Sequence, residues 1–283
     1  MRISDKNIDR VYVERFIREK SFKMPKFHLH PYYELYYVET GTVRAFIKDG
    51  MYDLEAGDLL IISPQIVHYM RYYGDIPCKR TNVFFRKDDI KEVLEDFDIL
   101  SFREKLMLRL DPAGMARTEN ILSLMLDEEE HPDVYSEEIN RARLSELLML
   151  SLRHGDEWDA LSEELHTGDK CILAAAGYMS SNFRERISLD DISAAAGLSP
   201  NYLSTKFREL TGMGVHDYLQ LVRLKHASAL LAGSRISITE VALECGFSGS
   251  NYFKDAFKKA YGITPGRYRK ENRPESYKIV QFL

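Results

Sequence analysis

Two histidines near the start of the chain have the residue type and spacing of a binding site. His28 and His30 stand in HLHPYYELYYVETG, residues 28–41, a segment rich in side chains that favour β-strands. Side chains two residues apart in a strand point to the same face, so both imidazoles are expected on one side of a sheet. Imidazole ligates transition metals and also hydrogen-bonds polar small molecules. This segment is therefore the first candidate site.

A second segment extends the pattern. GDLLIISPQIVH, residues 57–68, places a Gly-Asp pair, a proline and His68 at characteristic spacings. Together the two segments resemble the two motifs of the cupin family, over roughly residues 20–86. In metal-binding cupins this pattern carries iron, manganese, nickel or zinc. The resemblance implies a shell of three histidines and one carboxylate, made of His28, His30, Glu34 and His68.

Three interpretations of these polar residues stay open: they bind a metal, they contact a polar ligand, or they satisfy one another inside a core. Aromatic side chains with hydroxyl groups are frequent nearby and suit sugar-like ligands; they are Tyr32, Tyr33, Tyr36, Tyr37, Tyr69, Tyr72 and Tyr73. The predicted ligand-binding residues are His28, His30, Glu34, Tyr36 and His68, and a carbohydrate is the preferred effector.

The elements that position these residues are expected to be short strands. Between residues 8 and 86, runs rich in Val, Ile, Tyr and Phe alternate with turn signals, including Asp49-Gly50, which favours a tight hairpin. This series predicts a small cupin-like β-barrel. Helical spacing follows over about 88–153, strongest at about 116–129 and 136–153. The break at 131–133 predicts a helical hairpin, which either dimerises two chains or packs on the barrel.

The last third of the chain contains a repeat. ISLDDISAAAGLS, residues 187–199, aligns with ISITEVALECGFS, residues 236–248. In each copy a serine favours the start of a short helix, and Gly197 or Gly246 favours its end. A second helix follows the glycine, so each copy is predicted to be a helix-turn-helix. Residues 215–232 have a helical period and predict a helix that links the copies.

The second helix of each copy has one apolar face and one polar face. Leu203 and Phe207 are four residues apart, as are Phe253 and Phe257, and these pairs are expected to be buried. Short hydrogen-bonding side chains near the helix start, followed by cations, are what a reader of the DNA major groove requires. A solvated polar face would look similar in one helix, but its appearance in both copies favours DNA binding.

The segment GFSGSNYFKDAFKKAYGITPGRYRK, residues 246–270, closely resembles the signature of the AraC/XylS transcription regulators. The resemblance covers about residues 169–273, and many such regulators begin with a cupin-type sensor domain. It implies a seven-helix DNA-binding domain with two helix-turn-helix subdomains. Base contacts carried over by position are Asn201, Ser204, Thr205, Arg208, Ser250, Asn251, Lys254 and Asp255. The expected phosphate contacts are Lys206, Lys258, Lys259, Arg267, Arg269 and Lys270. One departure is Val215, which stands where the second copy has Pro265 and puts the helix entry there in doubt.

The charge is distributed as a DNA-binding half would require. The 283 residues carry a net charge of −5. Residues 1–166 hold 23 Lys and Arg against 33 Asp and Glu, whereas residues 167–283 hold 16 against 11. The three cysteines, Cys78, Cys171 and Cys245, have no CxxC spacing, which argues against a zinc ribbon or a disulfide scaffold. No secretory signal and no membrane-spanning run is visible, so a cytoplasmic location is expected.

The sequence therefore predicts a multidomain α+β protein. Residues 1–165 are expected to form a cupin-like effector-binding and dimerisation domain, and residues 166–283 an all-α double helix-turn-helix domain. The predicted function is sequence-specific transcription regulation without enzymatic activity. The expected partners are double-stranded DNA, a small-molecule effector, a second copy through helices about 116–153, and RNA polymerase as a further candidate. No cofactor is required, and a divalent transition metal in the barrel is the alternative.

Two other functions fit parts of this pattern. One is a cupin metalloenzyme, an isomerase or oxygenase, fused to a DNA-binding module. The other is a signalling output module driven by a partner protein, although no receiver-domain pattern precedes the repeat.

Overall fold

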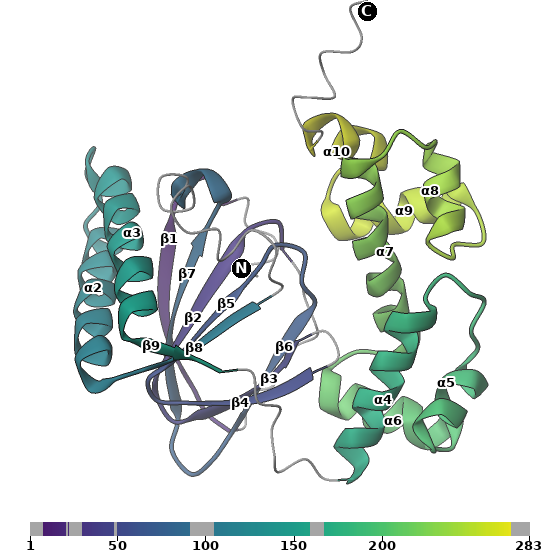
Figure 1. Ribbon diagram of the computed structural model, residues 1–283, viewed down its shortest axis with the longest axis horizontal. Helices are drawn as coiled ribbons and strands as arrows, with labels where there is room; N and C mark the ends of the chain where they lie inside the picture. Colours follow the sequence, from purple (N-terminus) through teal and green to yellow (C-terminus); the bar gives the residue numbers. More distant parts are fainter. Residues whose placement is uncertain are drawn as a thin grey trace, which may run out of the picture. The chain divides into compact units, whose positions relative to one another are not determined.

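The computed structural model describes residues 8–20, 22, 30–47, 50–90, 105–158 and 167–272. The chain divides into two compact units, residues 1–164 and 165–283. The first is rich in strands and the second is helical (Figure 1). Among the described residues, no helix combines the length and the apolar character needed to cross a membrane.

The N-terminal unit is built from two antiparallel sheets. Six strands pair in the order β1-β7-β2-β5-β8-β9, and three strands pair in the order β4-β3-β6. The strands are β1 (Tyr12–Arg18), β2 (Tyr33–Thr40), β3 (Thr42–Ile47), β4 (Gly50–Glu55), β5 (Asp58–Ile62), β6 (His68–Tyr73), β7 (Cys78–Phe85), β8 (Lys105–Leu110) and β9 (Gly155–Glu157). The register pairs Ile47 with Gly50, so the predicted hairpin joins β3 to β4.

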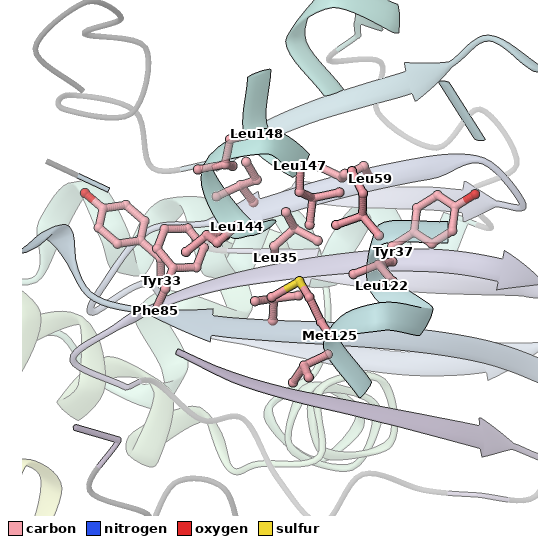
Figure 2. Packing of buried hydrophobic residues seen from close by; sticks show 14 of the residues in the cluster. Tyr33, Leu35, Tyr37, Leu59, Phe85, Leu122, Met125, Leu144, Leu147 and Leu148 are labelled. Carbon is pink, nitrogen blue, oxygen red and sulfur yellow. The ribbon is translucent and has the colours of Figure 1, made fainter. Parts of the chain in front are cut away.

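The period of two along each strand gives the six-stranded sheet two different faces. One face packs against the helices α2 (Pro112–Glu130) and α3 (Ser136–His154), which lie side by side on it (Figure 1). Figure 2 shows Leu35 and Leu59 of the sheet meeting Leu122 and Leu147 of the helices. The helical hairpin therefore does pack on the sheet, one of the two roles that its sequence allowed.

The other face of the six-stranded sheet looks toward the three-stranded sheet. Residues of both sheets share one buried cluster, including Tyr36 and Leu60 from the first and Met70 and Tyr72 from the second. Within the described residues, the strands enclose this core as two sheets rather than as one closed barrel. The space between the sheets is called the inter-sheet core below.

One part of the predicted helical region is wrong. Residues 105–110 form strand β8, and residues 87–90 form the short 3-10 helix η2 (Lys87–Ile90). Residues 91–104 lie outside the described part of the chain. Leu106 and Leu108 meet the helices and Met107 meets the inter-sheet core, whereas Lys105 is half-buried and Arg109 is exposed. The strand has only six residues and stands within a region of helical spacing, so its period of two was not recognised.

The C-terminal unit has seven helices within residues 167–272. They are α4 (Thr167–Asn182), α5 (Leu189–Ala196), α6 (Pro200–Thr211), α7 (Val215–Gly233), α8 (Ile238–Glu244), α9 (Ser250–Tyr261) and α10 (Pro265–Asn272). Both helix-turn-helix copies are present, as α5–α6 and α8–α9. Helix α7 runs between them (Figure 1). Val215 and Pro265 are each the first residue of a helix, so helix entry is equivalent in the two copies.

Local signals explain where these helices begin and end. Ser188 and Ser237 each form a capping box, with Asp191 and Glu240 respectively. Gly197 and Gly246 follow the first helices in left-handed conformations, with φ of 67° and 75°. The N-cap and glycine signals of the sequence thus act as expected in both copies.

Candidate functional site

Three of the predicted site residues meet in the inter-sheet core. His30 stands before β2, Glu34 lies on β2 and His68 begins β6. Glu34 Oε2 lies 2.9 Å from His30 Nε2 and 3.1 Å from His68 Nε2. Their ligating atoms all lie within 4.8 Å of one another, and all three residues are buried. His28, the fourth predicted member, lies outside the described residues.

The proton count of these histidines is unusual. The second ring nitrogen of each also faces an oxygen: His30 Nδ1 lies 2.8 Å from the Tyr32 carbonyl, and His68 Nδ1 lies 2.9 Å from the Ile66 carbonyl. A neutral imidazole carries one N–H, so it can satisfy only one of its two oxygen neighbours. Two extra protons, one on each imidazole, would satisfy all of these oxygen neighbours, and one divalent cation could take their place.

The electrostatics of the cluster favour an ionised carboxylate and neutral imidazole. Burial lowers the pKa of His30, and the hydrogen bond with Glu34 opposes this change without reversing it. Burial alone would raise the pKa of Glu34, but hydrogen bonds with His30 and His68 hold it well below its usual value. In the tautomer in which Nδ1–H donates to the backbone carbonyl, Nε2 carries no proton and faces the carboxylate, and this is the form in which an imidazole ligates a metal.

The predicted aromatic lining is only partly correct. Tyr36 and Tyr72 lie in the inter-sheet core, and Tyr32 stacks on the His30 ring at 4.3 Å between centroids. Tyr33 and Tyr37 instead point to the helix-covered face, where Tyr33 stacks on Phe85 (Figure 2). Adjacent residues of a strand point to opposite faces, so a run of tyrosines cannot all line one site.

Two inward residues on β7 were missed by the sequence analysis. Asn82 Nδ2 donates to Glu34 Oε1, which occupies the second carboxylate oxygen. Arg80 is 4% exposed, and its Nε donates to Tyr72 Oη at 3.1 Å. The sequence did hold a signal for these two residues. Arg80 and Asn82 are two positions apart in a largely apolar strand, so they point to the same face, and that face is buried.

The predicted DNA-reading residues lie on α6 and α9 with their polar faces outward. Leu203, Phe207, Phe253 and Phe257 are buried, as their spacing predicted. Asn201, Thr205, Arg208, Asn251, Lys254, Asp255 and Lys258 are exposed, whereas Ser204, Lys206 and Ser250 are half-buried. The base-contact candidates of the two copies thus occupy equivalent positions on two exposed helix faces.

Two arginines of α10 differ from simple exposed cations. Arg267 Nε makes an ion pair with Glu271 Oε1 at 2.6 Å, which phosphate would have to compete with. Arg269 is half-buried, and its Nε and Nη2 atoms are shielded from solvent. A phosphate contact by Arg269 requires its side chain to move.

Comparison with known proteins agrees with this architecture. Residues 12–165 match the family described as the AraC-like ligand binding domain, and residues 192–271 match a helix-turn-helix domain. The HTH-type transcriptional activator RhaR of Shigella dysenteriae serotype 1 is 30% identical over 255 residues, which cover 87% of each chain. RhaR of Escherichia coli K12 is 30% identical over 253 residues, again with 87% coverage of both.

Among solved structures, ToxT of Vibrio cholerae O395 aligns over 93% of this chain and 96% of its own. The sequence identity is 14% and the TM-score 0.36, too low for the superposition to carry an argument.

A sheet-rich ligand-binding domain followed by two helix-turn-helix units defines a DNA-binding transcription regulator rather than an enzyme. More particularly, the chain belongs to the AraC family. The alternative of a cupin metalloenzyme therefore gives way to the regulator.

Proposed function

We propose that this regulator activates transcription by reading a two-part operator with α6 and α9 under the control of a small effector in the inter-sheet core. The observation that carries the proposal is the repetition of exposed hydrogen-bonding and basic side chains on the two second helices. Activation is proposed because the RhaR relatives are transcriptional activators. It would take place in the cytoplasm through contact with RNA polymerase.

The proposed base contacts are Asn201, Ser204, Thr205 and Arg208 from α6, and Ser250, Asn251, Lys254 and Asp255 from α9. Phosphate contacts are assigned to Lys206, Lys258, Arg267 and Arg269. Helix α7 has 19 residues, about 28 Å at 1.5 Å per residue. Successive major-groove faces on one side of B-DNA are about 34 Å apart. One chain can thus present both readers to adjacent turns.

Selection of bound DNA from a random library tests this function directly. The full chain is expected to enrich two short motifs whose centres are about 10 base pairs apart. A variant with Asn251→Ala and Lys254→Ala should keep the motif read by α6 and lose the one read by α9. Enrichment of a single motif, or no enrichment above random DNA, would refute two-helix reading.

The effector is proposed to contact Tyr36 together with His28, His30, Glu34 and His68, and to be a carbohydrate. Tyr36 and Tyr72 support this choice, because their rings offer apolar faces while their hydroxyl groups hydrogen-bond. Burial and the neighbouring Tyr72 hold the pKa of Tyr36 well above its usual value, so it stays a neutral donor.

We also propose a divalent transition metal at His30, Glu34 and His68, with His28 as a further ligand. The support is the proton deficit of the two imidazoles, since one divalent cation has the charge of the two missing protons. Two histidines and one carboxylate suit zinc, iron, manganese or nickel. Such a metal would join β2 to β6 and could hold an oxygen of the effector.

Elemental analysis of the purified protein tests this proposal by measuring the metal content per chain. Protein made in metal-supplemented medium should contain about one transition metal per chain, and His68→Gln should remove it. His154→Gln is the control, because His154 lies on α3 and contacts Asp111 instead. Less than stoichiometric metal in the wild type, or equal metal in His68→Gln, argues against the site.

We propose that the chain forms a homodimer through the outer face of α2 and α3. A groove of about 450 Å³ there is lined by Arg117, Glu146, Met149 and Arg153, among others. Leu124 and Met149 expose 43% and 44% of their surface. The groove carries both Glu146 and the arginines, so its charges are complementary to a second copy of the same surface, which makes a second copy the fitting occupant.

Sedimentation equilibrium tests the dimer. Met149→Glu should raise the dimer dissociation constant by about tenfold or more, because a charge then enters the apolar contact. Ile76→Glu makes the same change at a residue that is 61% exposed and distant in sequence from the hairpin. Equal dissociation constants for the two variants would assign the groove no role in dimerisation.

A further inference from the structure

Arg80 is a buried cation that makes no direct ion pair with a carboxylate of the described residues, although the charge of Glu34 acts on it from a longer distance. It is 4% exposed in the inter-sheet core, and its Nη1 atom has no hydrogen-bond partner. Its guanidinium carbon lies 5.1 Å from the ring centroid of Tyr36 and 5.4 Å from that of Phe16. Within the described residues, no carboxylate forms an ion pair with Arg80.

A second arginine lies beside the first. Arg18 is half-buried, and its guanidinium carbon lies 4.3 Å from the ring centroid of Phe16 and 4.2 Å from that of Phe22. Its Nε atom is also buried without a hydrogen-bond partner. The two arginines therefore flank a shared aromatic ring, and Arg18 is the member that reaches solvent.

The nearest site carboxylate cannot supply the missing charge by a direct contact. Both oxygens of Glu34 are already engaged, Oε2 by His30 and His68 and Oε1 by Asn82. Tyr72 Oη accepts from Arg80 and from the Tyr36 hydroxyl at 3.4 Å, so its own proton is available to an incoming oxygen. A buried guanidinium with no anion in direct contact is unfavourable, because Tyr72 and the more distant Glu34 compensate its charge only in part, and a bound oxyanion lowers that cost.

We propose that the inter-sheet core binds a small organic oxyanion, a carboxylate or a phosphate monoester, at Arg80, with Arg18 and the Tyr72 hydroxyl as further donors. The planar guanidinium matches both anions in a two-point contact. This inference rests on the proposed function, because it gives the effector its chemical class. For a carbohydrate effector it selects a sugar acid or sugar phosphate over a neutral sugar.

Thermal unfolding of the full chain with matched ligands tests the class of effector. The probes are glucose, glucuronate and glucose 6-phosphate, then acetamide, acetate and inorganic phosphate, with sodium chloride holding the ionic strength equal. At about 20 mM, an acidic probe should raise the melting temperature of the N-terminal unit by about 3 °C or more above its neutral match. Glucuronate and glucose 6-phosphate distinguish a carboxylate from a phosphate ester.

Arg80→Met should abolish the difference between acidic and neutral probes, and Arg80→Lys should keep part of it. Equal shifts with charged and neutral probes, no shift with any probe, or a difference that persists in Arg80→Met each overturn the proposal.

The stability of the ligand-free variants separates a binding role from a structural one. Arg80→Met should leave the melting temperature of the N-terminal unit unchanged or raised, because an unpaired buried charge is removed. The matched control is Arg109→Met. Arg109 pairs with the fully buried Asp58 at 2.8 Å, so its loss should lower the melting temperature by roughly 5 °C or more. A comparable fall in Arg80→Met makes Arg80 structural and refutes the inference.

Failure of the inference and failure of the proposed function give different results. If the library selection finds no operator while acidic probes still bind at Arg80, the proposed function fails and the oxyanion site stands. If an operator is selected but no probe depends on Arg80, the regulator stands and the oxyanion site fails.

Discussion

Single residues on α6 and α9 have two distinct tasks in DNA binding. Asn201 and its equivalent Asn251 can form paired hydrogen bonds with a base edge, which carry sequence information. Lys258, about two turns further along α9, presents a charge that attracts phosphate regardless of sequence. Substitutions at the two kinds of position should therefore change different properties of binding.

Asn201→Ala is expected to cost about 1–3 kcal/mol for the selected operator and much less for random DNA, because only base contacts distinguish the two. Lys258→Ala should weaken both complexes similarly and reduce the slope of log affinity against log salt by about 1. Fluorescence anisotropy at several salt concentrations measures both effects. If Asn201→Ala weakens both complexes equally, its side chain does not read a base.

At the level of elements, the two helix-turn-helix copies share their caps but differ in their surroundings. A Cβ atom at Gly197 would meet nothing within 4 Å. At Gly246 it would collide with the carbonyl oxygen of Phe183 and lie 2.9 Å from that of Arg184. Arg223 of α7 donates to the same Phe183 carbonyl and to the Glu185 carbonyl, each at 2.8 Å. The second copy is thereby held against the end of α4.

Gly246→Ala should destabilise the C-terminal unit more than Gly197→Ala. Both changes incur about 1–2 kcal/mol because an alanine must adopt a left-handed conformation. Gly246→Ala adds a backbone collision, so a total of about 3 kcal/mol or more is expected. Urea unfolding of both variants measures the difference. Equal losses would mean that the contact between Gly246 and Phe183 has no energetic weight.

At the level of the whole molecule, two separate cores predict two unfolding events. The N-terminal core is formed by strands with α2 and α3, and the C-terminal unit has its own cluster around Phe253 and Phe257. The proposed operator contacts lie in the second unit, and the proposed effector contacts lie in the first. A regulatory link between them requires a ligand with different affinities for two states of the chain.

Calorimetry of the full chain should resolve two transitions. Operator DNA is expected to raise the temperature of the transition that Gly246→Ala lowers. An acidic ligand is expected to raise the temperature of the transition that Arg109→Met lowers. Non-operator DNA of equal length is the control. A single transition, whose temperature rises with either ligand, would show that the two units unfold together.

Much of the DNA-binding unit could be predicted because its signals are local. The capping serines, the left-handed glycines and the four-residue apolar spacing each act within one or two turns of helix, and each is confirmed. Strand β8 was not recognised, because it is short and its pairing partner, β5, lies far away in the sequence. The same limit applies to Tyr33 and Tyr36, which are alike in the sequence but lie on opposite faces of one sheet.

Read alone, the sequence establishes an acidic half and a basic half with two helix-turn-helix copies, since composition and local periodicity carry this information. The family and the sensor role follow from the resemblance of its motifs to known regulators. Strand pairing across the fold decides which polar groups become neighbours. It brings His30, Glu34 and His68 together and buries Arg80 with no carboxylate of the described residues in direct contact. The chemistry of the effector site depends on these distant contacts, because desolvation and unsatisfied charge arise only when the two sheets close over the side chains.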